Sequence, residues 1–274
     1  MQLDFRARRM NLSVYVDGIG ILGPGLQGWP AAAAVLTGRS AYQAAATALA
    51  APALLPATER RRTGRVVKLA IGIALEATAQ AGADASKLPS VFSSSGGDGH
   101  NCHEIFQSLA APDRAISPTR FSNSVHNAAA GYWSIATGAM SASNVLCAFD
   151  ASFGAGLLDA AAQVCVNRES VLLAAYDTEY PAPLHEKRPI PDAFGIGLVL
   201  SDQQRPQSIA EIAIRLTNEQ SETLAEPQLE QLRRSIPAAR GLPLLRVLAM
   251  RTGGGTILDY LDDTRLSIEV KPCR

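Results

Sequence analysis

An apolar run passes directly into a helix of small residues in the segment NVLCAFDASFG, which spans Asn144 to Gly154. Asn144 to Phe149 has the composition of a buried strand, whereas the alanine-rich residues from 152 to about 167 favour a helix. A strand that leads into a helix through a tight turn is typical of α/β folds, and many α/β enzymes hold a nucleophile there. The segment therefore predicts an α/β fold with a candidate site at the turn.

The same alternation of strand and helix patterns continues along the chain. Strands are expected over 13–22, 90–95, 144–149, 170–177, 193–202 and 208–216, with the last two as a pair. Helices are expected over 29–36, 66–81, 100–109, 127–137 and 152–167. Irregular chain or loops are expected over 38–64, 117–127 and 181–191. Beyond residue 218 we expect a loop, an exposed helix, a helix over 242–250 and a closing strand pair over 252–261 and 266–272.

The charge of the chain is balanced, with 25 basic and 25 acidic side chains. This balance provides no overall attraction to nucleic acid or to an anionic membrane, and no run of roughly 18 apolar residues predicts a membrane span. The four cysteines lack paired Cys-x-x-Cys spacing, so we interpret them as free thiols of a reducing compartment. The first ten residues lack the apolar core of a signal peptide. These features predict a cytoplasmic protein that binds no nucleic acid.

Three short motifs admit a functional interpretation, but a structural one is favoured for each. The glycine cluster SSSGGDG over 93–99 lacks the spacing of a dinucleotide site and the lysine of a P-loop, which favours a turn. His100, Cys102 and His103 are close in sequence, yet no second ligand pair follows, and zinc needs more ligands. The TGGGT segment over 252–256 favours a hairpin turn or bulge. We therefore expect no metal or cofactor.

A basic run, ERRRTGR over 59–65, precedes the expected helix 66–81. One interpretation is a solvated helix face, which is the commoner meaning of such a run. The other is a docking surface for an acidic partner or a phosphate group. The residues that would form this surface are Arg60, Arg61, Arg62, Arg65 and Lys68.

Cys147 is the cysteine nearest to the strand–helix turn. A thiolate nucleophile needs a nearby base, and no histidine follows position 185. Free cysteine is among the most buried residue types, so a buried core cysteine is the favoured interpretation. The alternative is acyl transfer by Cys147 with His126 or His185 as the base.

Several segments together resemble the first half of the β-ketoacyl-acyl-carrier-protein synthases of the thiolase superfamily. They occur in the family's order: VYVDGIGILGPGLQGWPAAAAVLTGRSAY over 14–42, VFSSSGGDG over 91–99, SPTRFSNSVHNAAAG from Ser117, and DAFGIGLVLSD over 192–202. The resemblance covers roughly residues 11–202. It implies an α/β, thiolase-like half-fold, in which helices cover a mixed sheet. Residues 203–274 are expected to form a short α+β extension packed on the same domain.

The resemblance also implies where a nucleophile would stand. Aligning DASFGAGLLDAA, residues 150–161, with the small-residue helix that follows the family's nucleophile places Ala151 at the position of the catalytic cysteine. The family's two histidine segments, in the second half of the fold, have no counterpart here. Because nucleophile and bases are missing together, the resemblance implies a subunit without catalysis, similar to the chain-length factors of type II polyketide or aryl-polyene systems.

The same resemblance implies partners. Ketosynthases dimerise through the strand that leads to the nucleophile, so we expect a heterodimer with a full-length β-ketoacyl synthase and docking of acyl carrier protein on the basic run. The expected interface residues are Phe121, Asn123, His126, Asn127, Asn144, Val145, Leu146, Cys147 and Phe149. Two other hypotheses stay open at this point: a condensing enzyme or acyltransferase that uses Cys147, and a self-associating scaffold protein.

Overall fold

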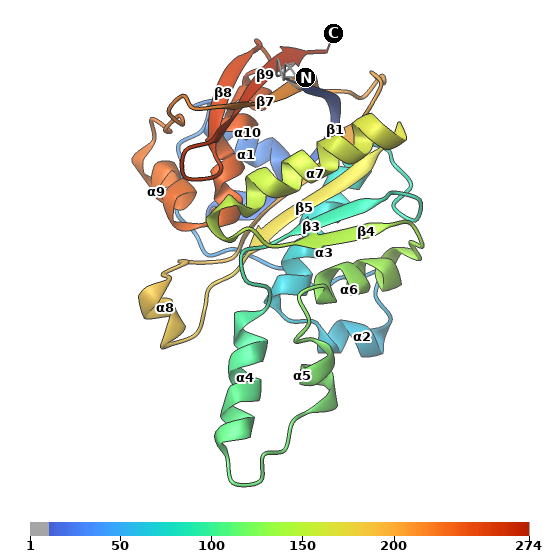
Figure 1. Ribbon diagram of the computed structural model, residues 1–274, viewed down its shortest axis with the longest axis vertical. Coiled ribbons are helices and arrows are strands. Elements are labelled where there is room, and N and C mark those ends of the chain that lie inside the picture. The colour runs from blue at the N-terminus through green and yellow to red at the C-terminus, as the bar shows by residue number, and fades with distance from the viewer. Residues whose placement is uncertain (1–10, 274) are drawn as a thin grey trace, which may run out of the picture.

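A single mixed sheet organises the computed structural model, which describes residues 11–273 (Figure 1). The expectation about the first ten residues lies outside this range. The strands follow the order β4-β3-β5-β6-β1-β7-β9-β8, and β2 pairs with the end of β1. β3 runs parallel to both β4 and β5, whereas all other neighbours are antiparallel. The mixed sheet of an α/β fold, which the sequence predicts, is confirmed.

The strands are short except for β1, which spans twelve residues and pairs with three neighbours. Their bounds are β1 Leu12–Gly23, β2 Leu26–Gln27, β3 Ser90–Ser93, β4 Ser143–Leu146, β5 Val171–Asp177, β6 Phe194–Ser201, β7 Ala210–Thr217, β8 Gly254–Asp259 and β9 Arg265–Pro272. The final strands β7, β9 and β8 continue the sheet beyond β1.

Helices cover both faces of the sheet (Figure 1). The α-helices are α1 Trp29–Leu36, α2 Ala57–Arg62, α3 Arg65–Gln80, α4 Gly99–Ala110, α5 Pro118–Ser122, α6 Ala128–Thr137, α7 Ser152–Asn167, α8 Leu184–Lys187, α9 Pro227–Ser235 and α10 Leu242–Met250. The 3-10 turns are η1 Phe149–Ala151 and η2 Pro237–Gly241. α3 and α6 belong to one apolar core, and α1, α7 and α10 belong to the core on the opposite face. Between residues 11 and 273, no helix combines the length and apolar character that crossing a bilayer requires.

The structure corrects four expectations about individual elements. β6 and β7 do not pair with each other, because β1 lies between them and pairs with both. β4 ends at Leu146 rather than at Phe149, since the chain turns into η1 there. β3 ends at Ser93 rather than at residue 95. The segments expected to be irregular contain the short helices α2, α5 and α8, which are too short for a periodic pattern to reveal.

A seam of glycines brings α3 against the middle of the sheet. A Cβ atom at Gly18 would lie 2.1 Å from the carbonyl oxygen of Ala77, and one at Gly20 would lie 2.1 Å from that of Ile73. On the neighbouring strand, a Cβ at Gly197 would lie 2.4 Å from the same Ile73 oxygen. The helix backbone therefore touches the backbones of β1 and β6 directly, which only glycine permits.

Two polar side chains of α3 complete this contact. The carboxylate of Glu76 accepts hydrogen bonds from the amides of Ile21 at 2.9 Å and Trp29 at 2.5 Å. The side-chain oxygen of Gln80 accepts from the amide of Ile19 at 2.7 Å. The amides of Ile19 and Ile21 lie beyond the part of β1 that pairs with β7, so α3 supplies acceptors that no strand provides.

We expect Gly20→Ala to destabilise the fold by about 1–3 kcal/mol, because the new methyl group must push α3 away from the sheet. The matched control is Gly131→Ala within α6, where a Cβ meets nothing within 4 Å. That substitution should be neutral or stabilise the protein by up to about 1 kcal/mol. Urea unfolding of both variants measures the difference. Equal free energies of unfolding would show that the seam does not hold α3 in place.

Candidate functional site

The carboxyl ends of the three parallel strands meet at one end of the sheet. β4 ends at Leu146, β3 at Ser93 and β5 at Asp177. The segments that follow these strands are in contact: the Sγ atom of Cys147 donates to the carbonyl oxygen of Ser95 at 3.2 Å, and the amide of Ser95 donates to the Asp177 carboxylate at 2.8 Å. Ligand sites in α/β proteins form at this end of parallel strands, so this end of the sheet is the candidate site.

The turn between β4 and α7 has the backbone of a strained elbow. Phe149 has a φ of 50°, in the left-handed region that a bulky residue rarely adopts. The hydroxyl of Ser152 holds the turn, because it accepts from the amide of Ala148 at 3.1 Å and donates to the carbonyl of Phe149 at 2.7 Å. Ala151, which the alignment places at the nucleophile position, is 5% exposed, whereas Phe149 is 62% exposed. The exposed residue of the turn is therefore Phe149.

A charged cluster surrounds the aromatic ring of Phe149. The guanidinium of Arg188 lies over the ring, 3.8 Å from its centroid. Asp150 binds Arg188 at 2.6 Å through one carboxylate oxygen and Arg240 at 3.0 Å through the other. The two arginines come from the segment after α8 and from η2, so three distant parts of the chain meet at the turn. The sequence analysis did not find these arginines, because no local pattern marks them.

Cys147 is exposed, contrary to the expectation of a buried core cysteine. β4 has already ended at Leu146, so the cysteine lies at the rim of an edge strand rather than inside the sheet. Within residues 11–273, neither candidate base is hydrogen-bonded to this thiol: the Nε2 atom of His126 is buried without a hydrogen-bond partner, and His185 lies on α8. The structure thus places Cys147 at the site without bringing a base to it.

β4 is the edge strand on this side of the sheet. The carbonyl oxygens of Ala142 and Leu146 accept hydrogen bonds from the β3 side at 3.0 and 3.2 Å. Because backbone groups alternate in direction along a strand, the amides of Ser143 and Val145 point to the open side. Exposed apolar side chains lie on α6 and on the segments before and after β4, namely Ile135, Met140 and Phe149, and two more lie on α5 and the connection that follows it, Phe121 and Val125.

The predicted interface residues fall into two groups. One group lies on β4 and the following turn and comprises Asn144, Val145, Leu146, Cys147 and Phe149. The other runs from the last turn of α5 to the start of α6 and comprises Phe121, Asn123, His126 and Asn127. Phe121 is exposed at 67%, whereas the Asn123 amide is already engaged: it donates to the carbonyl of Arg62 at 3.1 Å and accepts from the Tyr132 hydroxyl at 3.1 Å. The sheet edge and this connection are thus joined through α6.

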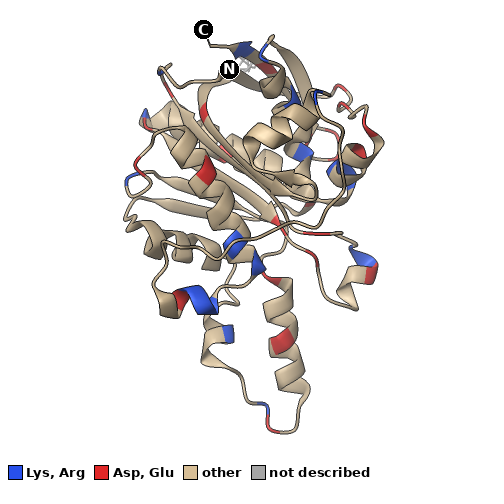
Figure 2. Ribbon diagram, turned by 180° about the vertical axis from the view of Figure 1, so that it is seen from behind, with Lys and Arg blue, Asp and Glu red and all other residues tan. Residues whose placement is uncertain are grey.

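The basic run lies where α2 and the start of α3 meet the base of the projecting α4–α5 arm (Figure 2). Arg65 is engaged by Glu179 and Asp192, both at 2.8 Å. Arg62 pairs with Glu59 at 3.0 Å, one turn away on α2. Within the described part of the chain, the remaining cations of the run have no ion pair: Arg60, Arg61 and Lys68.

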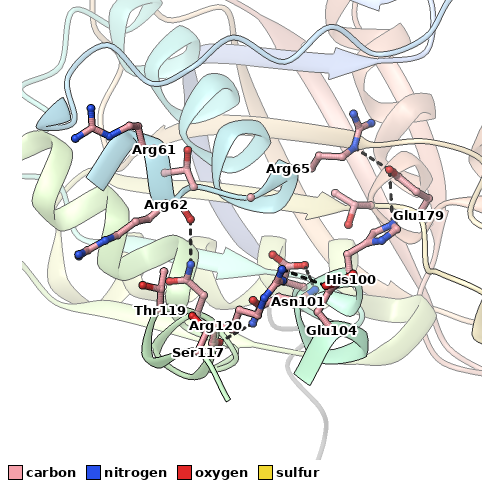
Figure 3. Close-up of a pocket in the computed structure, with 15 residues that line it drawn as sticks. Arg61, Arg62, Arg65, His100, Asn101, Glu104, Ser117, Thr119, Arg120 and Glu179 are labelled. Atoms are coloured by element: carbon pink, nitrogen blue, oxygen red, sulfur yellow. Dashed lines mark hydrogen bonds and ion pairs between the residues drawn. The ribbon is translucent and has the colours of Figure 1, made fainter. Parts of the chain in front are cut away.

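A polar pocket of about 580 Å³ lies beside this run, between α2, α4 and α5. In Figure 3, Arg61 and Arg62 extend outward from α2 on one side of the pocket, and Arg65 lies with Glu179 on the other. Arg120 of α5 also lines it and pairs with Glu104 at 3.1 Å. Among residues 11–273, no three His, Cys, Asp or Glu side chains gather in a way that could hold a metal ion.

Comparison with known proteins identifies the family. The profile of the β-ketoacyl synthase N-terminal domain matches residues 29–249, which is most of the chain and includes α9 and α10. The chain belongs to this family. A comparison with curated protein sequences finds no match.

Solved structures share the fold at low sequence identity. The complex of the ketosynthase ApeO with its chain length factor ApeC from Xenorhabdus doucetiae contains a chain that matches with a TM-score of 0.71 at 20% identity, over 94% of this chain and 99% of that one. A chain of AntDE:AntF, a type II polyketide synthase acyl-carrier protein in complex with its ketosynthase, matches with a TM-score of 0.73 at 10% identity, over 96% and 100%.

A third match is the ishigamide ketosynthase/chain length factor, with a TM-score of 0.69 at 15% identity over 96% of this chain and 100% of that one. The coverage is nearly complete on both sides in all three cases, so the matched chains are about as long as this one. The chain therefore has a ketosynthase-like and chain-length-factor-like fold of the kind found in type II polyketide systems.

Asp177 is the most unusual titratable group at the carboxyl end of the strands. Its carboxylate is buried and accepts hydrogen bonds from the amide and hydroxyl of Ser95 at 2.8 and 2.6 Å and from the amide of Ala238 at 2.8 Å. Burial raises the pKa of Asp177 from its ordinary 3.8 to about 6, although these donors act in the opposite direction. The residue ties the segment after β3 to η2.

The raised pKa predicts a pH dependence of stability. A carboxyl whose pKa is higher in the folded state stabilises the fold below its unfolded pKa, and this contribution is lost as the pH rises through about 6. Relative to Asp177→Asn, the wild type should therefore lose up to about 3 kcal/mol of unfolding free energy between pH 4 and pH 7. Denaturant unfolding of both proteins across this range provides the measurement. Parallel profiles would contradict the shifted pKa.

Proposed function

We propose that this chain is a non-catalytic, chain-length-factor-like partner subunit of a full-length β-ketoacyl synthase. The partner would perform the condensation on acyl carrier protein thioesters, in fatty-acid-like or polyketide elongation of the aryl-polyene type. The proposed setting is the cytoplasm, in agreement with four cysteines that are free.

The observation that carries this proposal is the open edge of β4. Outward-pointing amides on an edge strand favour pairing with another strand, and the apolar side chains around β4 favour burial against a protein surface. In the family to which the chain belongs, this strand pairs with its counterpart in the dimer, as the resemblance implies. A ketosynthase partner would pair with the open amides of β4 and bury the apolar side chains beside it.

The residue types at the turn support the absence of catalysis. The elbow between β4 and α7 holds Phe149 and Asp150, and no histidine follows position 185. The thiol of Cys147 donates a hydrogen bond to the carbonyl oxygen of Ser95. A carbonyl oxygen cannot act as the general base that activates a thiol. Acyl transfer needs a nucleophile with a base in hydrogen-bond reach, so the arrangement favours a role for the chain in shaping its partner's site.

The connection between α5 and α6 is the part of the chain that we propose to shape the growing acyl chain. Val125 on this connection and Phe121 at the end of α5 are both exposed to solvent. Apolar side chains of this size can limit the length of an apolar tunnel in a partner by filling its end. Asn123 fixes the connection through its hydrogen bonds to α2 and α6, so its shape does not depend on the partner.

We further propose that acyl carrier protein docks on the basic run of α2. Arg65 is held by two carboxylates of the fold, so its charge is largely compensated. Arg60, Arg61 and Lys68 have no such partner among the described residues, and Arg61 and Arg62 are exposed. Their charge is available to an acidic protein surface, and a contact of this kind weakens as salt screens it.

The main test is co-expression with a ketosynthase encoded beside this chain, followed by size-exclusion chromatography. We expect the two wild-type chains to elute together at 1:1 and Val145→Pro to elute apart, because proline removes an amide on the open side of β4 while leaving the pairing with β3 intact. Val145→Thr is the matched control, since it keeps both the amide and the branched side chain. It should elute with the ketosynthase.

Assays of the same proteins distinguish the partner subunit from an acyltransferase and from a scaffold protein. The chain alone should have no condensing activity on malonyl and acyl carrier protein thioesters. Condensation that disappears in Cys147→Ser would instead favour an acyltransferase, and self-association without binding of the ketosynthase would favour a scaffold protein. Separate elution of the wild-type chains at micromolar concentration, with full activity in the ketosynthase alone, would refute the partner role.

Carrier protein binding provides a separate prediction. Replacing Arg60, Arg61 and Arg62 with alanine should weaken the affinity for acyl carrier protein about tenfold, or about 1.4 kcal/mol. The control replaces three exposed cations on other surfaces, Arg39, Lys87 and Lys271. Calorimetric titration at low and high salt measures both variants. An affinity that is unchanged by the first set, or reduced equally by both, would place the docking surface elsewhere.

A further inference from the structure

The elbow between β4 and α7 has a residue whose properties the proposed function does not explain. Phe149 is a large aromatic residue in a left-handed conformation, yet most of its ring is exposed to solvent. A bulky side chain at positive φ persists only where the surroundings hold it, and such residues concentrate at functional sites. Burial of the ring in the core of this chain is therefore not what keeps Phe149 in place.

Two contacts are made to this residue directly, and three further interactions support them. The Ser152 hydroxyl donates to the carbonyl of Phe149 and accepts from the amide of the preceding residue. Arg188 covers one face of the ring at 3.8 Å. Asp150 orients Arg188 through a contact of 2.6 Å and is itself bound by Arg240 at 3.0 Å. The Nε atom of Arg188 is buried without a hydrogen-bond partner. The guanidinium therefore contacts the Phe149 ring and the Asp150 carboxylate while one of its donors stays unsatisfied.

The local sequence is compatible with a nucleophile position at Phe149 rather than at Ala151. In the register that places Phe149 at the cysteine of the family's Thr-Ala-Cys turn, as the resemblance implies, Ala148 coincides with the family's alanine. Cys147 and Ala148 separate Phe149 from the end of β4, and α7 begins at Ser152, so Phe149 lies in a strand-to-helix turn as the residue of a nucleophile elbow does. The register with Ala151 at the nucleophile position would place the nucleophile at a buried side chain, whereas Phe149, in the same 3-10 turn, is exposed.

We infer that Phe149 occupies the nucleophile position of this fold and that its exposed ring, covered on one face by Arg188, stands where a reactive thiol would be. The backbone at Phe149 has the left-handed conformation of a strained turn, but a phenylalanine side chain has no nucleophilic atom. This inference concerns the chain by itself, so it does not depend on whether a ketosynthase binds to β4.

Thiol scanning in the purified chain tests the inference. In a Cys147→Ser background, Phe149→Cys is compared with Ala151→Cys by alkylation with iodoacetamide, in which the thiolate sulfur forms a bond to carbon and iodide leaves. Each site is quantified by mass spectrometry of its peptide. We expect the thiol introduced at 149 to react at least about tenfold faster, since its position is exposed at the turn and beside a guanidinium. Equal rates, or a faster reaction at 151, would overturn the assignment.

Arg188 provides the matched test of the charged cluster. In the Phe149→Cys background, Arg188→Met should slow alkylation several-fold, whereas Arg188→Lys should retain most of the rate because it retains the positive charge. A rate that Arg188→Met leaves unchanged would show that the guanidinium does not act on this position.

A second measurement covers the case in which Phe149→Cys fails to fold. Phe149→Gly and Phe149→Val both remove the ring, but a branched side chain is poorly tolerated at a φ of 50°, whereas glycine adopts it freely. We expect the valine variant to melt several degrees below the glycine variant. Equal melting temperatures would contradict a left-handed elbow at this residue.

Discussion

The direct contact between the backbone of α3 and the strands β1 and β6 is the constraint on which the rest of the structure depends. Gly18, Gly20 and Gly197 leave no side chain between helix and sheet, so α3 crosses the centre of the sheet at the shortest possible distance. The helix then supplies Glu76 and Gln80 to amides of β1 that no strand reaches. Packing at backbone distance permits little adjustment, since any displacement breaks both the seam and these hydrogen bonds.

The position of α3 decides where the charged surface lies. Its first turn brings Arg65 to Glu179 and Asp192, which belong to the segments after β5 and before β6. Arg61 and Arg62 of α2 consequently extend outward on one side of the pocket (Figure 3), and α2 lies at the base of the α4–α5 arm (Figure 2). The same sheet leaves β4 as an edge at one end, next to α6 (Figure 1). The surface proposed for a carrier protein and the edge proposed for a ketosynthase are thus consequences of one packing arrangement.

Sequence patterns predicted elements well where periodicity was long and poorly where pairing decided the outcome. The helices over 66–81 and 152–167 and the strand over 170–177 carry continuous apolar patterns, and the structure has α3, α7 and β5 there. The pairing of β6 with β7 was wrong, because two strands adjacent in sequence can both join a longer strand between them. Cys147 was expected in the core, but an edge strand has an exposed rim that composition does not reveal.

The sequence by itself determined the fold class, the family resemblance and the absence of histidine after position 185, because these depend on residue types and their order. Only the tertiary structure decided which residue of the turn is exposed, that Asp177 lies buried among three donors, and that Arg188 and Arg240 meet at Asp150. The physical reason is the separation along the chain over which each kind of interaction acts. Periodicity and composition act between neighbours, whereas burial, strand order and ion pairing join residues that are far apart in the chain, such as Arg65 and Asp192, which are 127 positions apart.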